Sequence, residues 1–341
     1  MDSAPPDAVL EAFALAGGAI EAMQPGNVHE TQVVTNPDGR FVVQRINTSV
    51  FADPEALMEN AVRAGRCMER VAAHPLEYRS TVRGDLLARS GTDVWRAYRY
   101  VEGRVVSRPA SVDEAFAIGR AFGRFDAAIA VHPPERWHTV VPRYHDQKAR
   151  SAALEAAVAA DAAGRLAEAT PVLEGLGSVL VWLDAQPGSR AWASVPVRVA
   201  HHDAKGVNLV FADDGTMAVL DLDTVMAGTV LSDVGELIRT CARPTAPDSP
   251  FDHEIAVAAV RGFVDGWGLE PTPAELAALP ISGIRMTAQN SVRFLTDHLQ
   301  GDTYYRVAEP GENLERALAM LAHAEAQIAA HAPFAAAVLR D

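Results

Sequence analysis

A short polar segment between β-rich runs constrains this chain more than any other feature. Residues His201–Asn208 read H-x-D-x-K-x-x-N, and Asp221 and Asp223 follow after a turn at Asp213–Gly215. The flanking runs at 195–200, 207–211 and 217–222 are rich in β-branched and apolar residues, so they predict short strands. A polar loop closed by a hairpin that returns an acidic residue is typical of ATP-dependent phosphoryl transfer.

Each requirement of that chemistry has a candidate in the segment. Phosphoryl transfer needs a carboxylate for the attacking hydroxyl, positive charge at the γ-phosphate and oxygen ligands for Mg²⁺. We expect Asp203 to be the base and Lys205 the cation. Asn208 and Asp221 are the expected Mg²⁺ ligands, with Asp223 assisting, because Mg²⁺ prefers oxygen donors.

The same letters also have a purely structural explanation. An Asp–Asn turn beside an ordinary hairpin, with His201 and His202 as packing residues, would leave a similar pattern. The lysine at the expected offset, the flanking runs and the second acidic residue favour the catalytic interpretation. We expect His201 to orient the loop by hydrogen bonding rather than to transfer a proton.

The rest of the chain divides into a β-rich and a helical part. Runs at 31–35 and 40–46, separated by the turn residues Asn36–Gly39, predict a hairpin, and Asp53-Pro54-Glu55 predicts a helix start. The sequence thus predicts an α+β chain with an N-lobe at 1–103 and a mainly helical C-lobe at 104–341. Further strands are expected at 85–90 and 94–101, and helices at 111–131, 148–167 and 170–185.

The N-lobe is expected to bind the nucleotide, although it contains no lysine. Arg45 is the positional substitute for the strand lysine of kinases, with Glu55 or Glu59 as its expected partner. Alternatively, Arg45 is a surface strand residue. The hairpin opening at Gly26–Thr31 is a possible phosphate cover, in which Val28, His29 and Thr31 are the expected contacts.

Composition limits the partners. The net charge of −14 argues against nucleic acid or an anionic membrane as the main partner, because both require a basic face. The two cysteines form no paired motif, the N-terminus is not a signal peptide, and we identified no apolar run of about 20 residues. We therefore expect a cytoplasmic protein, monomeric or homodimeric, that binds a nucleotide and a small molecule.

Four stretches resemble one known family. Residues 41–47 with 57–60, 95–103, 221–228 and 293–305 are similar to the N-acetylhexosamine 1-kinases, which belong to the aminoglycoside phosphotransferase-like kinases. The resemblance implies a two-lobed protein-kinase-like fold, the cofactors ATP and Mg²⁺, and transfer to the anomeric hydroxyl of a hexosamine. It also implies an arginine in place of the kinase lysine, and nucleotide contacts at Tyr100 and Val101 in the connector.

The resemblance further implies an acceptor pocket built partly from the end of the chain. The candidates there are His145, Asp146, Arg293, Asp297 and Tyr304. A structural alternative applies to two of them, since Arg293 and Asp297 have the i, i+4 spacing of a helix-surface ion pair.

Departures from the family pattern leave the acceptor open. His202 and Val207 stand where the family usually has asparagine, and Ala227 stands in place of proline. Positions 202 and 207 flank the acceptor site, so N-acetylglucosamine, N-acetylgalactosamine, an unacetylated amino sugar and other hexoses remain candidates. The alternatives are a kinase of the same fold for an aminoglycoside, methylthioribose, choline or homoserine, or an inactive kinase-shaped binding protein.

Overall fold

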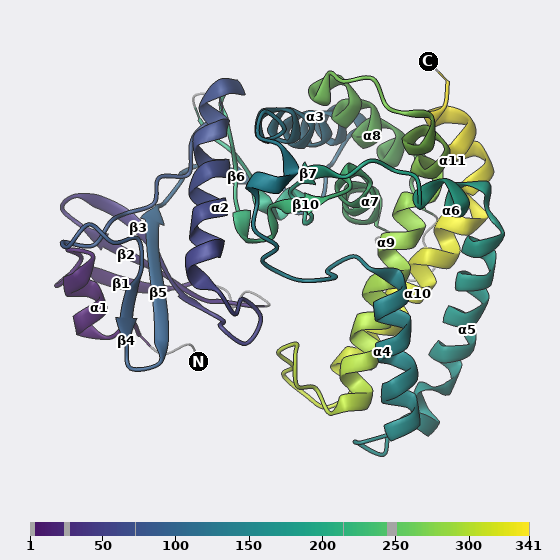
Figure 1. Ribbon diagram of the computed structural model, residues 1–341, viewed down its shortest axis with the longest axis horizontal. Coiled ribbons are helices and arrows are strands. Elements are labelled where there is room, and N and C mark those ends of the chain that lie inside the picture. Colours follow the sequence, from purple (N-terminus) through teal and green to yellow (C-terminus); the bar gives the residue numbers. More distant parts are fainter. Residues whose placement is uncertain (1–3, 24–27, 72, 214, 244–250, 341) are drawn as a thin grey trace.

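The computed structural model describes residues 4–23, 28–71, 73–213, 215–243 and 251–340. The chain forms two lobes, with a strand-rich lobe on the left of Figure 1 and a larger helical lobe on the right. The predicted α+β architecture with two lobes is confirmed. The predicted lobe boundary at Gly103 falls between β5 (Asp93–Arg99) and β6 (Arg104–Val105).

The N-lobe is an antiparallel sheet in the order β1-β2-β3-β5-β4. The predicted turn closes the β2–β3 hairpin: Asn36 pairs with Gly39, whose φ of +128° suits glycine, and the Asp38 N–H donates to Asn36 Oδ1 at 3.0 Å. Strands β4 and β5 lie at the predicted positions 85–90 and 94–101 with shorter limits, whereas β1 was not predicted. The bounds are β1 Ala19–Ala22, β2 Glu30–Asn36, β3 Gly39–Ile46 and β4 Ala88–Ser90.

Each face of this sheet is covered differently. Phe41, Val43 and Trp95 pack with α1 (Asp7–Ala12), whereas Ile46 and Val94 pack on the opposite face with Leu57 of α2. The predicted start of α2 (Pro54–Cys67) is confirmed, because Asp53 accepts the Ala56 N–H at 2.9 Å and Pro54 occupies the first position. In Figure 1, α2 lies between the sheet and the C-lobe.

The C-lobe is built on a close helix pair, α3 (Val112–Ile129) and α8 (His253–Trp267). A Cβ on Gly119 would lie 1.9 Å from the Ala259 carbonyl oxygen, and one on Gly262 would lie 2.1 Å from that of Phe116. Only glycine allows the two backbones to approach this closely. The remaining helices are α4 Gln147–Ala160, α5 Leu166–Ala185, α6 Pro187–Trp192, α7 Val230–Cys241, α9 Pro273–Gln300, α10 Glu312–Ala329 and α11 His331–Val338.

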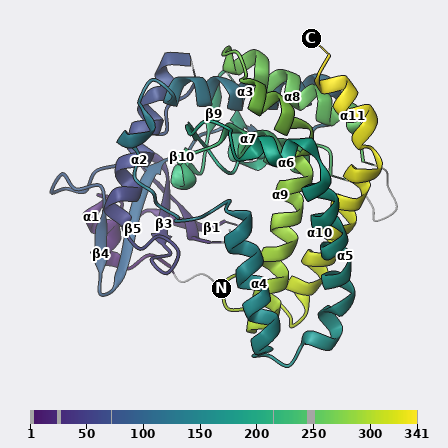
Figure 2. The same ribbon diagram turned by 45° about the vertical axis from the view of Figure 1, so that its right-hand side comes forward.

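Short strands at the junction of the lobes carry the polar segment. β7 (Arg198–Ala200) pairs with β10 (Met226–Gly228), and β8 (Leu209–Phe211) pairs with β6 and β9 (Met217–Val219). Both views place this region between the sheet and the helices (Figures 1 and 2). The residues between β7 and β8, and those between β9 and β10, therefore face the space between the lobes.

Among the described residues, α5 is the one helix that is long and apolar enough to cross a membrane. Such a helix is weak evidence for a span, since the core helix of a soluble protein can meet the same criterion. Val172, Leu176 and Val179 are buried in a cluster with residues of α9 and α10. A role in the C-lobe core therefore accounts for the apolar side of α5.

Candidate active site

The loop after β7 is fixed by the buried ring of His201. This ring lies between Phe122 and Phe125, with centroid distances of 5.5 and 5.6 Å. Its Nε2 lies 2.9 Å from the Leu220 carbonyl oxygen, and its Nδ1 lies 3.2 Å from the backbone nitrogen of Asp203. These partners require Nε2 to donate and Nδ1 to accept, and burial lowers the pKa of His201, so the ring is neutral. His201 thus has the geometry expected of a loop-orienting residue.

The Asp203 carboxylate lies at the centre of this loop. Lys205 Nζ is 2.6 Å from Asp203 Oδ2, and Asn208 Nδ2 donates to the same oxygen at 3.0 Å. Burial opposes ionisation of Asp203, but Lys205 outweighs it and holds the pKa of this carboxyl below its usual value. Burial likewise opposes the charge of Lys205, yet Asp203 and Asp221 raise its pKa. Asp203 is therefore an ionised carboxylate, as a base requires.

Asp221 follows β9 in a left-handed conformation, with φ +56° and ψ +58°. Its side chain is exposed. Desolvation by its surroundings, together with Asp223 and Asp203, raises the pKa of Asp221 to about 6. Excess negative charge of this kind favours a cation nearby.

The donor set around Asp221 fits Mg²⁺. Asn208 donates to Asp203 through its Nδ2, which fixes the plane of the amide and leaves its Oδ1 as the oxygen that can bind a cation. Across the described residues, no group of three His, Cys, Asp or Glu side chains could hold a metal ion. Mg²⁺ in kinases is commonly bound by one or two protein oxygens together with substrate phosphates and water. Asp221 and Asn208 would hold such an ion, which would neutralise phosphate charge.

Asp223, the third expected ligand, is committed to other partners. Its carboxylate accepts two hydrogen bonds from the guanidinium of Arg96, the one to Oδ2 at 2.7 Å, and His29 Nε2 lies 2.7 Å from the same oxygen. All three side chains are buried. These partners account for the Asp223 carboxylate without a metal, and its assistance to the metal stays a prediction. Asp223 connects the lobes, because Arg96 and His29 belong to the N-lobe.

Arg96, on β5, was missed by the sequence analysis. It lies opposite Gln44 in the sheet, and its Nε and Nη2 donate to Gln44 Oε1 at 3.0 and 2.8 Å. The only signal was a charged residue in the middle of the apolar and aromatic run Val94–Tyr98. Its partner Asp223 is 127 residues away in sequence, so no local pattern could reveal the pair.

Arg45 does not have the partner expected for a kinase lysine. It pairs with Glu30 and with Asp93, the latter at 3.1 Å, while Glu59 pairs with His138 at 2.7 Å. The predicted pairing of Arg45 with Glu55 or Glu59 is therefore wrong. The alternation of side chains along β3 explains this difference. Arg45 points to the opposite face of the strand from Gln44 and Ile46, and α2 packs on the face of Ile46. Glu55 instead pairs with Arg89 on β4.

The expected nucleotide contacts of the N-lobe hairpin, His29, Thr31 and Val28, lie near the lobe junction. Two of them already form hydrogen bonds within the protein. His29 Nδ1 accepts the Asn47 N–H at 3.1 Å, and Thr31 Oγ1 accepts from Gln44 Nε2 at 3.0 Å. With its other ring nitrogen on Asp223, His29 is held as a structural residue rather than as a free phosphate contact. Val28, Tyr304 and Arg45 line a polar cavity of about 200 Å³. Residues Gly26 and Asn27 of the predicted phosphate cover lie outside the described residues.

Tyr100 and Val101 occupy the connector between the lobes. The Tyr100 N–H donates to the Arg40 carbonyl at 2.9 Å, and its ring lies 4.1 Å from the Arg40 guanidinium carbon. Val101 packs against the main core. The expectation that these two residues contact the nucleotide stays a prediction.

Two of the five predicted acceptor-pocket residues have structural roles. Asp297 is buried and accepts the backbone N–H groups of residues 303–305, so it holds the loop after α9 rather than pairing with Arg293. Asp146 caps α4 by accepting the Ala149 N–H at 3.0 Å. A residue that closes a loop or caps a helix has little capacity left for a substrate.

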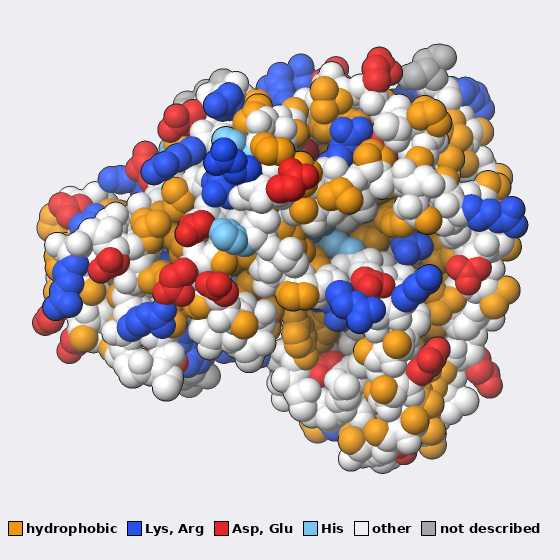
Figure 3. Space-filling model, in the orientation of Figure 1, with side chains coloured by type: hydrophobic (Ala, Val, Ile, Leu, Met, Phe, Trp, Pro, Cys, Tyr) orange, Lys and Arg blue, Asp and Glu red, His pale blue; other side chains and the backbone are white. Residues whose placement is uncertain are grey.

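Of the other three predicted residues, Arg293 and His145 lie beside Tyr144 and the catalytic loop. The Arg293 guanidinium carbon lies 5.0 Å from the centroid of the Tyr144 ring and 5.8 Å from that of Tyr305. His145 Nε2 lies 3.1 Å from the His202 carbonyl oxygen. Tyr304 is exposed. Figure 3 shows the surface hollowed between the two lobes, with basic and acidic side chains along the hollow.

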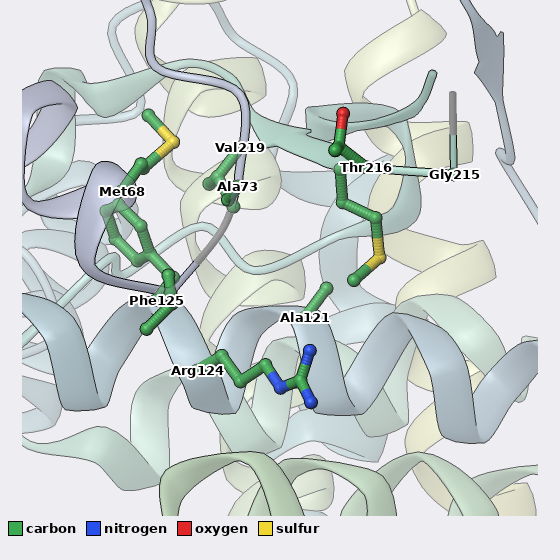
Figure 4. Close-up of a pocket in the computed structure, with 10 residues that line it drawn as sticks. Met68, Ala73, Ala121, Arg124, Phe125, Gly215, Thr216 and Val219 are labelled. Carbon is green, nitrogen blue, oxygen red and sulfur yellow. The ribbon is translucent and has the colours of Figure 1, made fainter. Parts of the chain in front are cut away.

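A second cavity of about 320 Å³ lies away from Asp203. Met68, Ala121 and Val219 form part of its mostly apolar wall, and Arg124 lies along one side (Figure 4). It shares only Phe125 with the packing around His201. The chemistry described above therefore lies between the lobes and not in this cavity.

Comparison with known proteins identifies the family. The model of the phosphotransferase enzyme family (APH) matches residues 20–279. Among solved structures, an aminoglycoside phosphotransferase from Alicyclobacillus acidocaldarius is similar, with a TM-score of 0.62, 14% identity and coverage of 99% of this chain and 96% of the other.

Two further structures share the fold at low identity. A spectinomycin phosphotransferase in complex with ADP and spectinomycin gives a TM-score of 0.59 and 10% identity over 91% of this chain and 92% of the other. A microcompartment-associated aminopropanol kinase gives 0.56 and 13% over 95% and 94%. The chain belongs to the APH phosphotransferase family and is therefore a phosphotransferase, and it has the predicted protein-kinase-like fold.

Proposed function

We propose that this kinase uses Mg²⁺ and ATP to phosphorylate the anomeric hydroxyl of a hexosamine or a related sugar. The observation that carries the proposal is the group formed by Asp203, Lys205 and Asn208, with Asp221 near Lys205. An ionised base, a cation and oxygen ligands for a metal lie together between the lobes. We further propose that it works in the cytoplasm as a monomer or homodimer.

The proposed reaction assigns one task to each side chain. Asp203 orients the acceptor hydroxyl and takes its proton as the oxygen attacks the γ-phosphorus. Lys205 Nζ lies 2.6 Å from this carboxylate. A γ-phosphate that approaches the hydroxyl held by Asp203 therefore also approaches the charge of Lys205. ADP leaves, and the proton remains on Asp203 until solvent removes it.

Charge around Tyr144 supports a sugar acceptor over a cationic one. Arg150, Arg239 and Arg293 all lie close to this ring or its backbone. Two carboxylates lie nearby in the described residues, and both are already paired, Glu236 with Arg239 and Asp203 with Lys205. A cationic acceptor such as choline or an aminoglycoside would require several free carboxylates here. A neutral sugar can stack on Tyr144 and accept hydrogen bonds from the guanidinium groups.

The cationic acceptors remain the second candidate, because similar solved structures include spectinomycin and aminopropanol kinases. The inactive binding protein is disfavoured, since Asp203, Asn208 and Asp221 are all present. ADP release from Mg·ATP should therefore be measured with N-acetylated and free hexosamines, hexoses, kanamycin, methylthioribose, choline and homoserine. Turnover restricted to the non-sugar acceptors would refute the proposed substrate but not the kinase.

The assignment of the base has its own test. Asp203→Asn should lower kcat by about 10²- to 10⁴-fold, the usual range for general-base catalysis, with ATP affinity nearly unchanged. Asp213→Asn is a matched control, because it removes an exposed carboxylate from the adjacent hairpin. Retained turnover in Asp203→Asn would refute the role of Asp203.

A further inference from the structure

Two carboxyl groups lie buried beneath the catalytic loop without a cation. Asp126 comes from α3 and Asp233 from α7, and each has an exposed fraction of 0%. The two side chains face one another closely enough to hydrogen-bond. The reaction proposed above uses neither of them, so their burial requires a separate explanation.

Hydrogen-bond partners account for only one of their four oxygens. Asp233 Oδ2 accepts the His201 N–H at 2.7 Å. Across the described residues, neither oxygen of Asp126 nor Oδ1 of Asp233 has a hydrogen-bond partner outside the pair. Two ionised carboxylates in this position would repel each other and lose their hydration.

The surrounding charges do not relieve that repulsion. From the loop after β7, the backbone N–H groups of His201 and His202 face Asp233, and that of His201 also faces Asp126. From α7, Glu236 adds further negative charge. Neither carboxyl has a salt bridge to an arginine or lysine across the described residues. A proton is therefore the remaining counter-charge.

We propose that Asp126 and Asp233 share one proton, and that Asp126 is thereby a positioning residue for phosphoryl transfer. The shared proton forms one O–H···O bond between α3 and α7. It leaves Asp233 Oδ2 to hold the His201 N–H, and the His201 ring in turn accepts the N–H of Asp203. The catalytic carboxylate is thus two hydrogen-bonded links from the shared proton.

The arrangement makes the loop sensitive to alkaline pH. Burial first, and then the neighbouring carboxyl, raises the pKa of Asp126, and burial raises that of Asp233. The folded state therefore retains a proton that the unfolded chain releases near pH 4. Stability falls as the pH rises from about 4 through the raised folded value, because the folded state binds more protons there. Loss of the proton leaves two repelling carboxylates under the loop.

The direct test is infrared spectroscopy of the intact protein. At pH 7 the wild type should show the carbonyl band of a protonated carboxylic acid, insensitive to hydrogen–deuterium exchange because it is buried. The band should be absent in Asp126→Asn, whose amide can donate to Asp233 without titrating. The band should persist in Asp265→Asn. This control removes an exposed carboxylate of α8 that pairs with Arg120 of α3, the helix that also carries Asp126.

A kinetic readout separates positioning from simple packing. In the wild type kcat should decline on the alkaline side, and in Asp126→Asn this decline should move up by about one pH unit or more, since no proton is lost. Asp265→Asn should follow the wild-type profile. The absence of the acid band from the wild type at pH 7 overturns the proposal even if Asp126→Asn does not fold. Persistence of the acid band in a folded Asp126→Asn variant also overturns the proposal.

Discussion

Replacing Arg96 by methionine should destabilise the protein strongly. The side chains of Arg96 and Asp223 are only 3% and 1% exposed, so solvent screens their interaction very little. Burial alone would lower the pKa of Arg96 and raise that of Asp223, yet the pair shifts both in the opposite direction. The substitution would leave the buried Asp223 carboxylate with only His29 as its side-chain partner.

The expected magnitude follows from that environment. Removing one member of a buried ion pair costs about 3–5 kcal/mol, because the other charge stays buried without compensation. Gln44 Oε1 would also lose two donors. For a protein of this size we expect a decrease of about 4–7 °C in Tm. Activity should decrease too, since the pair connects β5 of the N-lobe to the segment that carries Asp221.

The assay is urea and thermal unfolding followed by tryptophan fluorescence and circular dichroism, with ADP release measured in parallel. Arg89→Met is the matched control on the adjacent strand, because Arg89 forms an exposed pair with Glu55 and should cost less than about 1 kcal/mol. Combining Arg96→Met with Asp223→Asn should recover stability relative to Arg96→Met alone, because no buried charge is left unmatched. Equal effects of Arg96→Met and Arg89→Met would refute the reasoning.

Three further changes test other parts of the fold. Gly119→Ala should cost about 2–4 kcal/mol in chemical unfolding, because its Cβ would meet the Ala259 carbonyl, whereas Gly177→Ala on α5, with nothing within 4 Å, should be neutral or stabilising. Asp297→Ala should leave the backbone N–H groups after α9 without their acceptor, so hydrogen exchange should become faster at residues 301–306 only. Protection equal to that of the wild type at these residues would contradict the role of Asp297 in holding the loop. The pKa of Asp223 is lowered in the folded protein, so its contribution to stability is present above about pH 4 and is lost as the pH falls. Tm should therefore fall less steeply on acidification in Asp223→Asn than in the wild type. An equal dependence of Tm on pH in the two proteins would contradict this assignment.

The sequence by itself determined the features that depend on local spacing. The turn at Asn36–Gly39 and the capped start of α2 at Asp53 follow from residue preferences that act over a few positions. The polar loop likewise brings Asp203, Lys205 and Asn208 together within six residues, so any fold that forms this loop keeps them close. The class of chemistry was therefore predictable.

Tertiary structure decided which charged groups meet across the lobes. Arg45 and Arg96 both lie on N-lobe strands, and only the direction of each side chain placed Arg96 against Asp223 and Arg45 against Glu30. A strand's alternation shows which residues share a face, but not which face meets the other lobe. The buried pair of Asp126 and Asp233 depends in the same way on how α3 packs against α7. Contacts of this range are set by packing over the whole chain, which no short segment of sequence encodes.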